Sequence, residues 1–159
     1  MKKMGLVTAI FHSTEGAENA FQDLVNRGYD PGNIVVIMSQ ENYRLHFLGR
    51  VNPLSDDGEI SLAQYISRPG TSVELPGIGL VVSGPFATNP SLSDQTENGR
   101  DMLVSAGLEG DRAIIYEPEL HAGGTLIGFL PKGPTDRYTV GAGWRKLEGE
   151  LILGDDEDF

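Results

Sequence analysis

The three histidines of this 159-residue chain are its best candidates for acid–base or ligand chemistry. His12 follows an apolar run near the start, His46 lies in an irregular middle region, and His121 precedes a second apolar run. None stands at metal-ligand spacing from another, and the absence of cysteine excludes thiolate metal sites, iron–sulfur clusters and disulfides. We expect no metal and no cofactor. His12, Tyr43 and His121 are the candidate ligand-binding residues if the fold brings them together; the alternative is that the histidines are surface or capping residues.

Three further motifs do not match the functional pattern that each resembles at first sight. Ser13 has the position of an α/β nucleophile but no Gly-x-Ser-x-Gly context, so we interpret it as a helix cap. Gly77 and Gly79 precede an apolar run, whereas the glycines of a dinucleotide loop follow a strand. The acidic turn Asp56–Glu59 lacks the alternate spacing of a calcium loop. With no catalytic set visible, we expect a non-enzymatic protein.

The stretch from Met4 to Ser39 predicts a strand, an amphipathic helix and a second strand. Met4–Phe11 and Ile34–Met38 are apolar runs, and Ser13 or Thr14 is suited to cap the helix between them. Gly28 is a typical helix stop. The helix would bury one face, formed by Ala17, Ala20, Phe21, Leu24 and Val25. His12 then lies where a strand meets a helix N-terminus, a common ligand position in α/β units.

Residues 40–76 are predicted to form a long insertion, because turn signals recur at close spacing and strong elements are absent. Tyr43–Leu48 is predicted to be a short strand or helix, and periodicity does not separate the two. Residues 60–66 could form one short helix. An insertion of this kind is typical of a lid or an interaction loop.

The second half predicts a strand, helices and a strand. The strands are Leu80–Ser83 and Thr125–Leu130, and Arg100–Gly107 is a short helix. Asp111 is expected to cap a further helix, which Pro118 should break or kink before starting a new turn. Residues 138–140 and 144–153 could add a strand or a helix.

These elements predict an α+β fold with a ferredoxin-like split βαβ arrangement. We expect a four-stranded sheet with helices on one face, a single domain over residues 1–153 with the insertion at about 40–76, and an acidic tail at 154–159. A doubly wound parallel sheet fits less well, because only four strong strands are visible.

The charge balance argues against several partners. A net charge of −11, from 12 basic and 23 acidic residues, would repel nucleic acid and an anionic membrane surface. The longest uncharged apolar run is too short to span a bilayer, and the N-terminus lacks a signal-peptide cleavage site. We therefore expect a cytoplasmic protein that binds neither nucleic acid nor membrane.

Three passages resemble the bacterial general stress protein family, which carries a heat-induced stress protein (YflT-like) domain. They are Val7–Ala20 together with Arg27–Ile34, then Pro76–Pro85, and then Gly107–Ile127. The resemblance implies a small α+β domain associated with stress response, with no established enzymatic activity or catalytic residues. Residues 40–74 depart from it, because many relatives have a long Gly/Ala-rich segment there, and Pro118 interrupts a helix that is usually continuous.

Two functions follow from this reading. The first is a non-enzymatic stress-associated or regulatory domain that self-associates, as a homodimer, through an open sheet. The alternative is a small-molecule or metal-binding domain with a pocket under the 40–74 insertion, near His12 and Tyr43.

Overall fold

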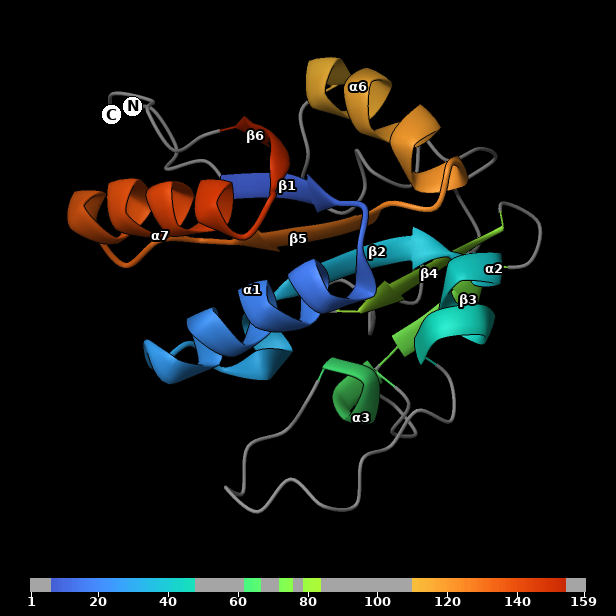
Figure 1. Cartoon of the computed structure of the whole chain (residues 1–159), viewed down its shortest axis with the longest axis horizontal. Helices are drawn as coiled ribbons and strands as arrows, with labels where there is room; N and C mark the ends of the chain where they lie inside the picture. The colour runs from blue at the N-terminus through green and yellow to red at the C-terminus, as the bar shows by residue number, and fades with distance from the viewer. Residues whose placement is uncertain (1–6, 48–61, 67–71, 76–78, 84–109, 154–159) are drawn as a thin grey trace.

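The fold is organised around a six-stranded antiparallel sheet (Figure 1). The computed structural model describes residues 7–47, 62–66, 72–75, 79–83 and 110–153. The strand order is β3-β4-β2-β5-β1-β6. The strands are β1 (Val7–Phe11), β2 (Val35–Ser39), β3 (Ser72–Leu75), β4 (Leu80–Ser83), β5 (Thr125–Phe129) and β6 (Glu150–Leu153). The α+β class is as predicted, but the sheet has six strands where we expected four.

Two strand–helix–strand units supply four neighbouring strands of the sheet. In the first, α1 (Thr14–Asn26) connects β1 to β2, which lie on either side of β5. In the second, α7 (Pro134–Lys146) connects β5 to β6, which lie on either side of β1. We expected the second unit to run from the Leu80–Ser83 strand to the Thr125–Leu130 strand. That prediction is wrong, because β4 pairs with β2 on the side away from β5 and extends the sheet with β3.

The ends of α1 are those the sequence indicated. Ser13 has an extended backbone, and its Oγ accepts the Gly16 N–H at 2.9 Å. At the other end Gly28 has φ +94°, a left-handed conformation that side chains with a Cβ rarely adopt. Ser13 is therefore a helix cap in the structure.

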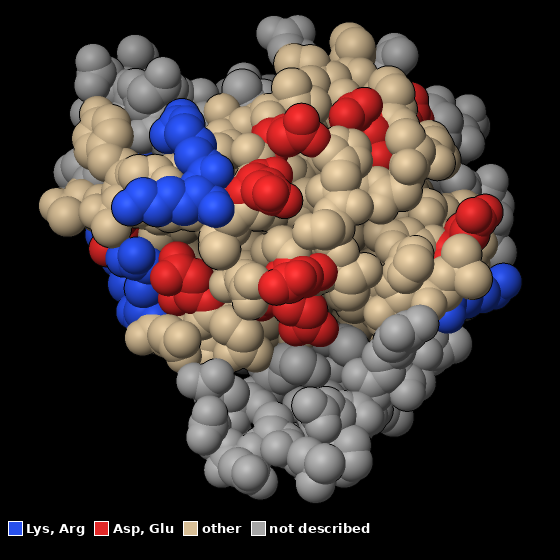
Figure 2. Space-filling view, in the orientation of Figure 1, with Lys and Arg blue, Asp and Glu red and all other residues tan. Residues whose placement is uncertain are grey.

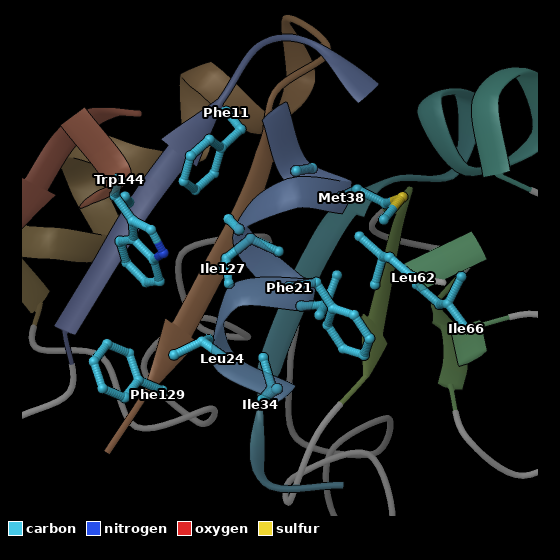
Figure 3. Packing of buried hydrophobic residues seen from close by; sticks show 14 of the residues in the cluster. Phe11, Phe21, Leu24, Ile34, Met38, Leu62, Ile66, Ile127, Phe129 and Trp144 are labelled. Carbon is cyan, nitrogen blue, oxygen red and sulfur yellow. The ribbon is translucent and has the colours of Figure 1, made fainter. Parts of the chain in front are cut away.

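Helices cover both faces of the sheet, which corrects the expectation that they lie on one. α1, α7 and the short α3 (Leu62–Ile66) share one hydrophobic cluster with alternate residues of β1, β2 and β5 (Figure 3). α6 (Gly110–His121) lies against the opposite face, where the Tyr116 hydroxyl is 2.9 Å from Thr8 Oγ1. The reason is that β1, β2 and β5 are buried along their whole length. Strands buried on both faces need a layer on each side.

Aromatic packing joins α7 to the sheet. The Phe11 and Phe129 rings meet the Trp144 ring edge-on, with centroids 5.6 and 5.5 Å apart (Figure 3). Such T-shaped pairs add roughly 0.5–1.5 kcal/mol beyond the area they bury. For residues 138–140 and 144–153 the expectation is a strand or a helix. The structure contains both, because α7 ends at Lys146 and β6 begins at Glu150.

The insertion packs its short helix on α1. Leu62 and Ile66 of α3 are fully buried in the main cluster, and the Glu18 carboxylate of α1 accepts the Leu62 N–H at 2.7 Å. The short helix expected at 60–66 is present over Leu62–Ile66, and the described part of the predicted strand or helix at Tyr43–Leu48 is helical over Tyr43–Phe47.

Helix α6 runs through Pro118, contrary to our expectation of a break there. Pro118 is exposed, so water can bind the carbonyl that loses its N–H partner. The helix also begins at Gly110, one residue before the expected cap Asp111. It ends in a Schellman turn, in which the Gly124 N–H donates to Glu119 O (2.9 Å) and Gly123 has φ +105°. The predicted helix Arg100–Gly107 and the acidic tail lie outside the described residues.

Within the described ranges, none of the helices is both long and apolar enough to cross a membrane.

Candidate functional site

All three histidines lie at one end of the sheet, which we call the histidine end. At this end β1 and β2 finish, at Phe11 and Ser39, while β4, β5 and β6 begin. The register shows this directly, because Thr125 at the start of β5 pairs with Phe11 and Met38 at the finish of β1 and β2. The last turn of α6 reaches the same end through the Schellman turn into β5.

His12 is engaged with two carboxylates. Its Nε2 lies 2.9 Å from Glu150 Oε2 and 3.3 Å from Glu119 Oε1. The three residues come from the end of β1, from β6 and from α6, so the imidazole ties three elements together. The side chains are 39 %, 61 % and 35 % exposed in the order His12, Glu150, Glu119, which keeps each ion pair weak.

A larger hollow lies beside this junction, over the ends of β2 and β5. Its volume is about 880 Å³. We call it the main hollow; it is lined by Ser39, Gln40, Glu41, Asn42, Arg44, Leu45, His46, Gly79, His121, Ala122 and Gly123. These residues come from three segments far apart in the sequence: the turn after β2, the turn before β4, and the turn between α6 and β5.

Hydrogen bonds hold the floor of the main hollow. The Ser39 Oγ accepts the Asn42 N–H at 3.0 Å and so starts the short helix α2 (Gln40–Asn42). The Asn42 amide donates to Thr125 Oγ1 at 2.9 Å in a buried contact. The Gln40 N–H donates to the Gly79 carbonyl at 2.8 Å. These hydrogen bonds therefore join the segment after β2 to the start of β5 and to the turn before β4.

The wall of the main hollow is a π-helical turn, η2 (Tyr43–Phe47). Tyr43 and Phe47 are 6 % and 0 % exposed and belong to the core, whereas Arg44, Leu45 and His46 between them are exposed. Single π-helical turns are rare and occur frequently at functional sites. The turn presents three consecutive side chains to solvent beside the main hollow.

The structure separates the residues that we selected from the sequence. His121 lines the main hollow, Tyr43 is buried beneath its wall, and His12 belongs to the junction with Glu119 and Glu150. The histidine that shares the main hollow with His121 is His46, which we had not selected. The signal in the sequence was the Arg-Leu-His triplet between the aromatic residues Tyr43 and Phe47, whose two ends are buried while the triplet is exposed.

His46 and His121 differ from His12 in their partners. Neither side chain has a hydrogen bond or an ion pair anywhere in the described part of the chain. No three His, Asp or Glu side chains among the described residues converge as a metal site requires. A ligand that contacts these two imidazoles would therefore displace no side-chain partner that lies in the described part of the chain.

The opposite end of the sheet holds a different polar cluster, which we call the closed end. The Tyr29 hydroxyl donates to Asp136 Oδ2 at 2.6 Å and accepts the Lys132 N–H at 3.0 Å. Burial, and then the hydrogen bond to Asp136, raise the pKa of Tyr29 to about 12, against a smaller lowering by the Lys132 N–H. The Lys132 ammonium lies 4.7 Å from the ring centroid. The hydroxyl of this tyrosine both donates and accepts a hydrogen bond, which indicates a structural role.

A second structural network fixes β6. The β1–β6 ladder contains a bulge, and Leu151 within it has φ +52°. The Tyr116 hydroxyl is 2.6 Å from the Leu151 carbonyl and donates to it. α6 thus holds the irregular edge strand in place, consistent with the general use of bulges at sheet edges.

No family model, curated protein or solved structure matches the chain. The resemblance to the general stress protein family stays a prediction.

Proposed function

We propose that this protein is a non-enzymatic binding domain that holds a small molecule in the main hollow. The observation that supports the proposal most directly is the pair His46 and His121, both exposed, both lining one hollow, and both without a side-chain partner in the described part of the chain. Polar groups that converge on a concave surface are typical of ligand sites.

The dimensions and construction of the main hollow support binding. Its volume, about 880 Å³, lies within the range of about 300–1,000 Å³ of small-molecule sites. Its floor is fixed by the buried Asn42–Thr125 hydrogen bond, so the site is largely formed before a ligand arrives. Binding at a pre-formed site avoids part of the entropic cost of ordering the protein.

Other side chains at the histidine end favour binding over catalysis. The Ser13 hydroxyl, which the sequence offered as a possible nucleophile, accepts a hydrogen bond from the first turn of α1. His12 could act as a base, but it is occupied by Glu119 and Glu150. Neither residue lines the main hollow.

The finer topology also belongs to the proposal. We assign the four strands β6-β1-β5-β2, with α1 and α7 as crossovers, to a ferredoxin-like split βαβ arrangement. The order and the antiparallel pairing of these strands support the assignment. β3 and β4 would then be an addition to one edge, and they supply Gly79 to the main hollow.

Thermal unfolding in the presence of a metabolite panel tests the proposal. A ligand at 100 times its Kd should stabilise the protein by about 2.7 kcal/mol, or roughly 5–10 °C in Tm for a chain of this size. Ala122→Trp, which fills the main hollow from an exposed position, should abolish the shift. Ala142→Trp, at an exposed position on α7, is the matched control and should preserve it.

Two results would contradict the proposal. One is a flat response across a broad panel of charged and neutral metabolites. The other is a ligand whose shift survives Ala122→Trp, since binding would then lie elsewhere. Unchanged circular dichroism of both variants serves as the folding control.

Self-association is the second candidate function, and the exposed face of α6 favours it. Ile114 and Ile115 are adjacent and 52 % and 41 % exposed, an apolar surface that a second copy could cover. Light scattering at micromolar concentration should then report a dimer mass, and Ile114→Glu should convert it to the monomer. A monomer mass for the unaltered protein would rule this candidate out. The link to stress response rests on the resemblance alone.

A further inference from the structure

We infer that the ligand of the main hollow is an uncharged, planar molecule whose edge carries an N–H donor beside a carbonyl acceptor, as in a nucleobase or a cyclic imide. Gln40, His46 and His121 bind this edge. The face of the ring covers Leu45. This inference deepens the proposed function and depends on it, because it names the class of molecule that the main hollow selects.

The charged side chains of the described lining balance one another. Besides the histidines, they are one carboxylate, Glu41, and one guanidinium, Arg44. Arg44 is already engaged in an interaction within the protein, so it is not counted as a donor to the ligand. An anion or a cation would therefore find no excess counter-charge in this lining, and moving a charge out of water without one is unfavourable.

The charge of the whole chain does not decide selection inside the main hollow. The net charge is −11, and Figure 2 shows acidic side chains spread across one face of the molecule, with basic side chains toward its two sides. Exposed charges separated by more than about 8 Å are largely screened at physiological ionic strength. The groups that line the main hollow therefore dominate the interaction with a molecule inside it.

Three side chains of the lining can both donate and accept hydrogen bonds. A carboxamide carries an acceptor oxygen and an NH₂ donor, and a neutral imidazole carries one donor and one acceptor nitrogen. Gln40 is half-buried, His46 and His121 are exposed, and none of these side chains has a hydrogen bond or an ion pair in the described part of the chain. A ligand edge with a donor beside an acceptor matches such groups, as when glutamine binds adenine through two hydrogen bonds. A carboxylate offers acceptors only and an ammonium donors only, so each would leave part of this set unused.

The protein holds these groups in separate elements around one hollow. Gln40 begins α2, His46 lies in η2, and His121 lies in the last turn of α6. The backbone of Gln40 is fixed, because its N–H donates to the Gly79 carbonyl at 2.8 Å. The set is therefore assembled by the fold, from segments far apart in the sequence.

The remaining lining explains why the molecule should be planar. Leu45 precedes His46 and is 57 % exposed, so a ring that covers it gains roughly 25 cal/mol per Å² of apolar surface. Gly79, Ala122 and Gly123 add small side chains or none. A methyl group at either glycine would meet no described atom within 4 Å. A flat ring can lie on such a low wall with its edge toward the polar groups.

Titration followed by NMR with four pyrimidines of similar shape tests the inference near neutral pH. The probes are uracil, 1,3-dimethyluracil, which lacks the N–H donors, orotate, which is an anion, and 5-(aminomethyl)uracil, which is a cation. We expect uracil to bind saturably. Each of the others should bind at least about fivefold more weakly, because it loses a hydrogen bond of ordinary strength or brings a charge without an excess counter-charge.

Gln40→Leu separates recognition from structure. The substitution nearly keeps the size of the side chain and removes the carboxamide, so it should weaken uracil by at least about fivefold and change 1,3-dimethyluracil by less than about twofold. A merely structural role would weaken both pyrimidines alike. Asn19→Leu, also an amide-to-leucine change, lies at an exposed position on α1 outside the described lining. It is the matched control and should leave both affinities unchanged.

The outcomes separate this inference from the proposed function. Equal or tighter binding of orotate or 5-(aminomethyl)uracil, blocked by Ala122→Trp, would overturn the uncharged class while the proposed binding function stood. Equal binding of uracil and 1,3-dimethyluracil would overturn the donor–acceptor edge in the same way. No saturable binding of uracil would also overturn the inference, and the metabolite panel would then decide the binding function by itself. An unchanged preference for uracil in Gln40→Leu would contradict the assigned residue.

Discussion

The two ends of the sheet use their polar side chains in different ways. At the closed end, the Tyr29 hydroxyl has partners on both sides, Asp136 and Lys132, and is 94 % buried (6 % exposed). At the histidine end, His46 and His121 are exposed and have no side-chain partner in the described part of the chain. Satisfied polar groups hold the fold together, whereas groups without partners are available to a ligand.

The same contrast recurs within the histidine end. The His12 Nε2 contacts Glu119 and Glu150, whereas His46 and His121 line the main hollow. Residue type and location at the same end of the sheet are alike for the three imidazoles, so they do not identify the functional ones. Their partners do.

The largest expected effect comes from a substitution at the closed end. The folded-state pKa of Tyr29, about 12, is above its ordinary value of 10, so between these values the folded state binds more protons than the unfolded state. Stability from this group is complete below pH 10 and is lost as pH rises through 12, at most about 3 kcal/mol. Tyr29→Phe should remove this loss in urea unfolding between pH 9 and about pH 12. Equal slopes for both proteins would contradict the structural role, since lysines titrate alike in each.

Asn42→Ala should break the floor of the main hollow. The substitution leaves the buried Thr125 hydroxyl without its partner, which costs about 1–3 kcal/mol. Asn19→Ala, on the exposed face of α1, is the control and should change stability by less than about 0.5 kcal/mol. Urea unfolding measures both. A cost no larger than that of the control would mean that the Asn42–Thr125 bond does not hold the floor.

Replacing both histidines of the main hollow should separate binding from stability. His46→Asn with His121→Asn should weaken binding of a metabolite that raises the Tm by about tenfold, or roughly 1.4 kcal/mol, because the contacts of two imidazoles are lost. The free energy of unfolding should stay within about 0.5 kcal/mol, since both side chains are exposed and lack partners in the described part of the chain. Loss of stability with unchanged affinity would reverse the assignment.

His12→Asn should give the opposite and smallest effect. The ion pairs with Glu119 and Glu150 are partly exposed, so their loss should cost about 0.5 kcal/mol in urea unfolding. Affinity for the same metabolite should change less than twofold, because His12 is not among the described residues that line the main hollow. A tenfold loss of affinity would place His12 in the ligand site after all.

Much of the scaffold could be predicted from local signals. The apolar run before His12, the Ser13 cap and the Gly28 stop define β1 and α1, and all three are features of short stretches of sequence. The strand Leu80–Ser83 is confirmed for the same reason. Its place in the sheet was not predictable from these signals, because pairing depends on contacts between distant segments.

The errors have physical causes in tertiary context. β6 is short and bulged, so it has no period to recognise, and only its pairing with β1 makes it a strand. Pro118 lies within α6 because its exposed face tolerates a missing hydrogen bond. The main hollow joins residues near 40, 79 and 122, which no local pattern relates. His46 could not be selected from the sequence, because nothing local to residues 44–46 relates them to His121.

The most direct test of the account observes the three histidines at once. In a protein labelled with ¹⁵N-histidine, the imidazole signals of His12, His46 and His121 are the complete set for the chain and can be assigned by single substitutions. As a metabolite that raises the Tm is added, we expect the His46 and His121 signals to shift together along one saturation curve, with the His12 signal unmoved. A shift of His12 alone, or no shift of His46 and His121 at saturation, would contradict the claim that the main hollow is the binding site.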